Sequence, residues 1–125
     1  MVLIVIDDTQ EVAEMATGIA SALKGNKVSV KNVTEFEGND ILPADVLFLG
    51  CKKPNLESFT YLSDLFKHIN LAGRPCGVFS AGSNAAAKYL AALVHDSEAA
   101  LKKEHLTINT GTGLKKWAQS VALGV

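Results

Sequence analysis

Several short segments of the chain carry side chains that could bind a ligand or a metal ion. Asp7 and Asp8 are adjacent carboxylates directly after an apolar segment, and Mg²⁺ prefers oxygen ligands of this kind. Lys52 and Lys53 form a basic pair that could neutralise those acids or attract a phosphate. Cys51 precedes the lysines, and nearby cations lower the pKa of a thiol. Each feature also has a purely structural interpretation: a capped helix, a solvated surface pair and a buried thiol.

Two glycine-containing turns, Gly82-Ser83-Asn84 and Thr110-Gly111-Thr112-Gly113, precede predicted helices. Backbone N–H groups in such turns can bind an anion, although glycine also serves simply to make a tight connection. The sequence contains no GxxxxGK[ST] motif and no zinc-type cysteine spacing. Its three histidines are scattered, without metal spacing or a Ser/Asp partner pattern. We therefore predict no catalytic residue and no metal site.

The elements that must position these residues alternate between strands and helices. Apolar segments are typical of strands buried on both faces, and a valine alternation is typical of a more exposed strand. Helical spacing of apolar residues, with caps and breakers at the ends, predicts the helices. The predicted strands are residues 2–6, 27–33, 46–49, 76–79 and 106–109. The predicted helices are residues 10–24, 55–71, 84–94 and 114–122, with a helical restart from Ser97 to about Lys103.

This alternation predicts an α/β fold with a five-stranded parallel sheet. Parallel neighbours need crossover connections, and the intervening helices supply them on both faces of the sheet. Right-handed crossovers favour the doubly wound order 2-1-3-4-5, a three-layer sandwich. No linker or internal repeat interrupts the pattern, so residues 1–125 are predicted to form a single domain.

In this strand order a crevice opens at the carboxyl ends of the strands, where the winding direction reverses. Three loops should surround the crevice: residues 7–10, 50–55 and 80–84. Helices begin at these loops, and their N-terminal N–H groups favour an anionic or polar ligand. Residues 1–51 hold three lysines and eight acids, whereas residues 52–125 hold nine basic residues and five acids. We therefore expect one acidic and one basic wall.

The overall composition excludes several classes of protein. Twelve basic and thirteen acidic residues give a net charge of −1, which excludes a generally basic nucleic-acid binder. No apolar segment approaches the length of a membrane span, and the N-terminal one is too short for a signal peptide. Cys51 and Cys76 lack a pairing pattern, so reduced thiols in a cytoplasmic protein are expected.

Three segments carry a resemblance to the flavodoxin family: residues 9–14 (TQEVAE), 44–51 (ADVLFLGC) and 71–80 (LAGRPCGVFS). The resemblance implies the flavodoxin-like fold, the cofactor FMN and electron transfer with a redox protein partner rather than an enzyme. In that family the first loop wraps the FMN phosphate, and the loops after strands three and four hold the isoalloxazine ring. The flavin contacts implied are Asp8, Thr9, Gln10, Cys51, Lys52, Lys53, Ser80, Ala81 and Gly82.

Two alternatives remain open on the same residues. The first loop keeps only the final Thr9 of the family's hydroxyl-rich stretch, and Asp7-Asp8 would repel a phosphate by roughly 1 kcal/mol per charge pair in bulk water. Lys52-Lys53-Pro54 stands where an aromatic residue is expected. The chain could therefore be a cofactor-free binding or regulatory module.

A degenerate response-regulator receiver is the other alternative. Asp7-Asp8 and Ser80-Ala81 match that pattern, whereas Gly50 replaces its phosphoacceptor aspartate and no lysine follows the fifth strand. Such a domain would bind partners through the face that carries Trp117.

Overall fold

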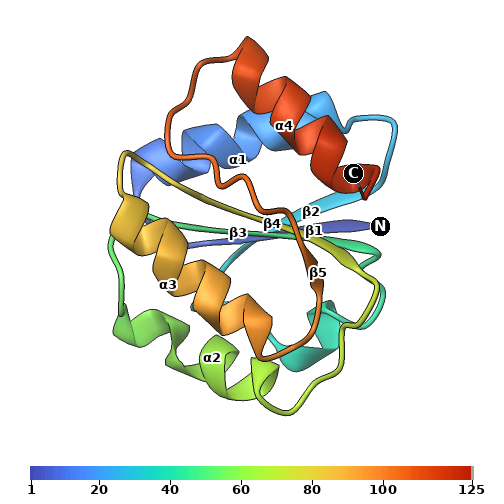
Figure 1. Cartoon of the computed structure of the whole chain (residues 1–125), viewed down its shortest axis with the longest axis vertical. Helices are drawn as coiled ribbons and strands as arrows, with labels where there is room; N and C mark the ends of the chain where they lie inside the picture. Colours follow the sequence, from blue (N-terminus) through green and yellow to red (C-terminus); the bar gives the residue numbers. More distant parts are fainter. Residues whose placement is uncertain (125) are drawn as a thin grey trace.

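A five-stranded parallel sheet, ordered β2-β1-β3-β4-β5, lies between two layers of helices (Figure 1). The computed structural model describes residues 1–124. Helices α1 and α4 cover one face of the sheet, and α2 and α3 cover the other. The predicted fold class and strand order are therefore confirmed. The strands are β1 (Val2–Ile6), β2 (Val28–Asn32), β3 (Val46–Cys51), β4 (Pro75–Ser80) and β5 (Ala100–Leu101). The helices are α1 (Gln10–Ala22), α2 (Thr60–Phe66), α3 (Asn84–His95) and α4 (Thr112–Ala122), with 3-10 turns at Gly38–Asp40 and Glu57–Phe59.

Two apolar layers hold the sandwich together. All five residues of β1 are buried, and they alternate between the layers, with Leu3 and Val5 facing one and Ile4 the other. Because successive strand side chains point to opposite faces, a strand in the middle of such a sheet must be apolar throughout. This is why the uninterrupted apolar segments predict the central strands so well.

The register of the strands sets where the loops meet. Ile6 of β1 lies beside Gly50 of β3, Gly50 lies beside Phe79 of β4, and Leu106 bridges Phe79 from beyond β5. These four residues form one row across the sheet. The residues that follow them are therefore brought together at one carboxyl edge, as the predicted topology requires.

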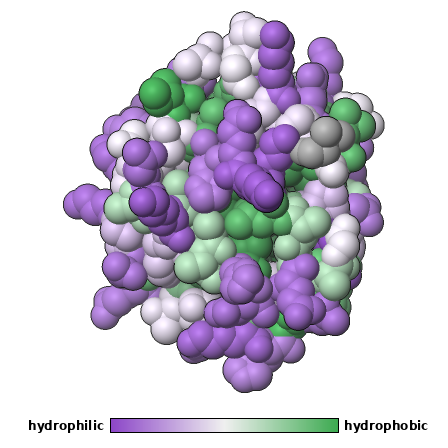
Figure 2. Space-filling model, in the orientation of Figure 1, coloured by the Kyte–Doolittle hydropathy of each residue, from purple (hydrophilic) through white to green (hydrophobic). Residues whose placement is uncertain are grey.

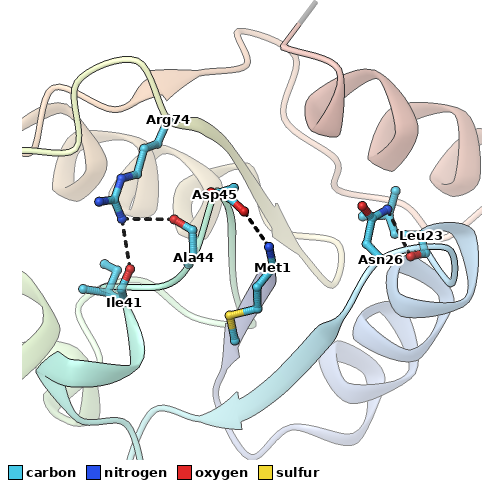
Figure 3. A network of polar contacts seen from close by, with 7 residues as sticks. All are labelled: Met1, Leu23, Asn26, Ile41, Ala44, Asp45 and Arg74. Atoms are coloured by element: carbon cyan, nitrogen blue, oxygen red, sulfur yellow. Dashed lines mark hydrogen bonds and ion pairs between the residues drawn. The ribbon is translucent and has the colours of Figure 1, made fainter.

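The opposite, amino edge of the sheet is joined by a polar network (Figure 3). The amino group of Met1 donates to Asp45 Oδ2 at 2.6 Å. Arg74 Nη1 donates to the carbonyl oxygens of Ile41 and Ala44, each at 3.0 Å. The hydrogen bond from the amino group, and then its charge, lower the pKa of Asp45. This network anchors the segments leading into β1, β3 and β4, at the end of the sheet away from the candidate site.

The predicted fifth strand at residues 106–109 and the helical restart at 97–103 are wrong. The fifth strand is Ala100–Leu101, paired with Pro75 and Cys76, and of the predicted strand only Leu106 bridges the sheet. The Ser97 hydroxyl donates backward to Val94 O at 2.7 Å, so it ends α3 instead of starting a new helix. Glu98 then has φ +62, a left-handed conformation that cannot continue a helix.

The helix predicted over residues 55–71 is also shorter than expected. Asn55 has φ +58 and leaves the helical region, so the segment begins with the 3-10 turn Glu57–Phe59 and continues as α2. α2 ends at Phe66, and Leu71 N donates to Ser97 O at 2.8 Å. None of the helices in residues 1–124 is long and apolar enough to cross a membrane.

Candidate functional site

The connection between β1 and α1 is built around the carboxylate of Asp7. Asp7 is only 4% exposed. Its Oδ1 accepts a hydrogen bond from Thr9 N at 3.1 Å. Its Oδ2 accepts from Thr9 Oγ1 and from Lys52 N, each at 3.0 Å. Asp7 therefore joins the loop after β1 to the loop after β3, and it does not cap α1.

The three residues that follow Asp7 were predicted as flavin contacts. Asp8 and Gln10 are exposed, and Thr9 is half-buried. The Thr9 hydroxyl donates to Asp7 and makes no cap hydrogen bond with α1. Gln10 Nε2 donates to Glu14 Oε1 at 3.4 Å, along the surface of the helix. Asp8 thus places a second, solvated carboxylate beside the buried one.

Cys51 and the lysines begin the loop after β3. Cys51 is fully buried, and its Sγ donates to Lys53 O at 3.3 Å. Burial, and next the negative charge of Asp7, raise the pKa of Cys51 to about 12. The lowered thiol pKa considered from the neighbouring lysines is therefore wrong. Lys52 Nζ instead makes an ion pair of 2.6 Å with Glu11 Oε2, and Lys53 is exposed.

The loop after β4 satisfies its own polar groups. Ser80 is buried, and its hydroxyl donates to Ser83 O and accepts from Ser83 N. Ser83 Oγ in turn accepts from Ala86 N and caps α3. Gly82 has φ +82, a conformation that favours glycine, and its N–H donates to Thr107 O at 2.8 Å. Of the predicted contacts in this loop, Ala81 is half-buried and Gly82 is exposed.

A cleft of about 510 Å³ lies at this carboxyl edge, in the size range of small-molecule sites. It is lined by Glu11, Glu14, Met15, Lys52, Ala81, Gly82, Thr107, Ile108 and Asn109. Of the predicted contacts, only Lys52, Ala81 and Gly82 line it. The other six (Asp8, Thr9, Gln10, Cys51, Lys53 and Ser80) belong to the same three loops but lie outside its lining.

Sequence reasoning missed the wall from α1 and the segment after Leu106. Glu11, Glu14 and Met15 follow helical spacing, which places them on one face of α1, so the pattern could have indicated this wall. Residues 107–109 are not predicted as site residues because the sequence pattern assigns them to a strand.

A second cavity, of about 470 Å³, lies beside β5. Its lining includes Cys76, Leu101 and Val121. Figure 2 shows apolar surface near the middle of this face, where β5 lies, among mostly hydrophilic side chains. Burial raises the pKa of the Cys76 thiol, so this cysteine does not supply a nucleophile.

The packing at Gly50 leaves no room for the aspartate that a phosphorylated receiver carries there. A Cβ placed there would lie 2.3 Å from Phe79 Cε2, so an aspartate cannot occupy this position unless the ring moves. Trp117 packs against Phe48 and Phe79, at ring-centroid distances of 5.5 and 6.3 Å, and donates from Nε1 to Glu104 O. Trp117 is thus a core residue, not one that presents a partner surface.

Comparison with known structures identifies the fold. No protein-family model matches this sequence, and no curated protein matches it. Flavodoxin 2 from Bacillus cereus superposes with a TM-score of 0.86 at 18% sequence identity, covering 99% of both chains. This is the flavodoxin fold. The Streptococcus pneumonia TIGR4 flavodoxin gives 0.85 at 18% identity, covering 99% of this chain and 98% of that one. Two-electron reduced Megasphaera elsdenii flavodoxin gives 0.79 at 21%, covering 98% and 99%.

A flavodoxin from Fusobacterium nucleatum, which superposes with a TM-score of 0.70 at 11% identity, is bound to flavin mononucleotide. In the present chain, the donors around Asp7 in the first loop do not fit a phosphate group. Three donors of the loops already serve Asp7, and no buried side-chain N or O atom in residues 1–124 lacks a partner. Among the described residues, no cluster of three or more His, Cys, Asp or Glu could hold a metal ion either. The cleft beside the loop has room for an uncharged ring, although its described lining includes no aromatic side chain.

Proposed function

We propose that this protein binds a flavin in the carboxyl-edge cleft and carries electrons to a redox partner in the cytoplasm. The observation that carries the proposal is the position of the cleft, between α1 and the loops after β3 and β4, in a chain with the flavodoxin fold. Ligands of open α/β sheets bind at this edge. The superposition on a flavodoxin in its two-electron reduced state supports the electron-carrier role.

The cleft offers a flavin apolar contact and an exposed stretch of backbone. Met15 and Ile108 are its larger apolar side chains, and Ile108 is 65% exposed. Gly82 brings bare backbone to the surface, where a planar ring can approach closely. Of the nine contacts implied by the resemblance, we propose Lys52, Ala81 and Gly82 as direct ones. The remaining six would act through the shape of their loops.

The purified protein tests this proposal directly. We expect the two visible absorption bands of an oxidised flavin, or quenching of flavin fluorescence when the colourless protein is titrated with riboflavin or FMN. Ile108→Asp should weaken flavin binding by about tenfold or more, because it removes an apolar contact and adds a charge. Leu42→Asp is the matched control, since Leu42 is 63% exposed and lies outside the cleft. A colourless protein that quenches neither flavin would refute the proposal.

A cofactor-free binding module is the second candidate, and the hydrogen bonds to Asp7 favour it. They engage three donors at the first loop that a phosphorylated cofactor would otherwise use. Under this candidate no flavin is quenched, yet a neutral or cationic small molecule raises the unfolding temperature. The Glu11→Gln variant would then lose affinity for a cation, since Glu11 lines the cleft.

A further inference from the structure

We infer that the Asp7 carboxylate is a built-in anion that takes the place of a ligand phosphate, so that the cleft selects riboflavin over FMN. The identity of the ring rests on the proposed function. The exclusion of phosphate does not depend on that proposal, because it rests on the hydrogen bonds of Asp7 and on the charges around them. Burying a carboxylate costs free energy unless its oxygens are hydrogen-bonded, and the Asp7 carboxylate accepts three hydrogen bonds.

The donors in question cannot serve Asp7 and a phosphate at once. Thr9 N, Lys52 N and the Thr9 hydroxyl each have one hydrogen to donate, and each donates it to Asp7. These groups come from the loops after β1 and β3, so together they close the first loop around the carboxylate. A phosphate could use them only if the Asp7 side chain left its place.

The charges around the cleft also disfavour a phosphate. Asp8 adds a solvated carboxylate in the same loop, and Glu11 and Glu14 both line the neighbouring cleft. Lys52 is the basic residue of that lining, and its ammonium group lies 2.6 Å from a Glu11 carboxylate oxygen. The acidic side chains therefore outnumber the basic one, and a phosphate dianion would enter against like charge.

Asp7→Ser and its control Asp8→Ser separate occupancy of the loop from charge alone. Each removes one negative charge from adjacent positions, but only Asp7→Ser releases the three donors. The dissociation constants of riboflavin and FMN are measured for both variants and the wild type by fluorescence quenching. The thermal midpoint is also compared in inorganic phosphate and in chloride at equal ionic strength. This second readout needs no flavin.

We expect the wild type to bind riboflavin at least as tightly as FMN, and to gain no specific stability from phosphate. Asp7→Ser should shift the ratio toward FMN by about tenfold or more, the effect of freeing hydrogen bonds to a charged group. Asp8→Ser should shift it by about threefold at most, as for exposed charges. Phosphate should raise the midpoint of Asp7→Ser above that of the two other proteins.

Three results would overturn the inference. These are tighter binding of FMN than of riboflavin by the wild type, equal shifts in the two variants, and equal phosphate stabilisation in all three proteins. If no protein binds either flavin, the proposed function fails, and the phosphate readout alone decides whether Asp7 excludes the anion. If Asp7→Ser does not fold, Asp7→Asn keeps the size of the side chain, and the wild-type ratio still decides.

Discussion

A methyl group at Gly50 tests how the edge of the sheet holds the loops of the cleft. Gly50 precedes Cys51 at the end of β3, and its carbonyl accepts a hydrogen bond from Asp7 N at 3.3 Å. A Cβ at this position would lie 2.3 Å from Cε2 and 2.4 Å from Cζ of Phe79. Phe79 is fully buried and packs against Trp117, so a shift of its ring would disturb the core. Gly50→Ala should therefore destabilise the protein.

The expected loss lies at the upper end of the range for an overpacked core, about 3 kcal/mol. For a chain of this size that corresponds to a fall in thermal midpoint of roughly 10 °C. Urea unfolding followed by circular dichroism measures the free energy of unfolding, and an unchanged slope would show that the unfolded states are comparable. The loss should appear almost entirely as a lower midpoint concentration.

Two variants make the measurement decisive. Gly25→Ala adds the same methyl group where nothing lies within 4 Å, and it should change stability by less than about 0.5 kcal/mol. In a Phe79→Leu background, Gly50→Ala should cost at least about 1 kcal/mol less than in the wild type, because the crowded ring atoms are gone. Equal costs for the two glycine variants, or no coupling with Phe79, would show that the ring does not exclude a side chain from this position.

Three further predictions concern the thiols and the ion pair at the cleft. Cys51, whose pKa of about 12 exceeds the ordinary value of 9.0, should resist a thiol-reactive disulfide at pH 8 in the native protein, as should the buried Cys76; both should react in urea. Because the folded pKa is raised, the stability contributed by Cys51 is complete below pH 9 and is lost as the pH rises toward 12, so the urea midpoint should fall in that window. Fast labelling of either thiol in the native protein at pH 8 would contradict the expected resistance to the disulfide reagent. Glu11→Gln removes an exposed ion pair with Lys52 and should shift the urea midpoint by less than about 1 kcal/mol in free energy; a larger loss would mean the pair holds the cleft's walls in place.

The central strands could be predicted from the sequence because the residues of each strand indicate it by themselves. β1, β3 and β4 are each buried along almost their whole length, so each appears as an unbroken apolar segment. The edge strand β2 is more exposed, and its sequence VSVKN alternates valine with polar residues over its first four positions. The strand order then follows from crossover geometry and not from any single residue.

The fifth strand could not be predicted because its pairing is not local. Ala100 N donates to Arg74 O, Lys102 N donates to Cys76 O, and Leu106 N donates to Val78 O. Pairing with β4 is thus divided between two short segments with a loop between them. Only Leu106 and its neighbours look like a strand in the sequence, whereas Ala100 and Leu101 are recruited by hydrogen bonds to residues far away in the chain.

The candidate site, too, could be predicted only in part. Lys52, Ala81 and Gly82 line the cleft as expected, because the ends of parallel strands must meet. What the sequence could not reveal is which of two adjacent aspartates turns inward. Asp7 is buried and Asp8 is exposed, and the buried carboxylate is held by hydrogen bonds from Thr9 N, Thr9 Oγ1 and Lys52 N.

The acidic and basic walls expected at the cleft pair with each other and do not face a ligand separately. Lys52 crosses from the loop after β3 to Glu11 on α1, so the basic wall is largely neutralised by the acidic one. The remaining carboxylate of Glu14 and the solvated Asp8 give this edge a negative potential. Since a shared fold does not fix the ligand, the residues at the edge must select it. Under the inference that Asp7 serves as the anion of the first loop, that selection runs against phosphate, and a bound flavin would be recognised by its ring.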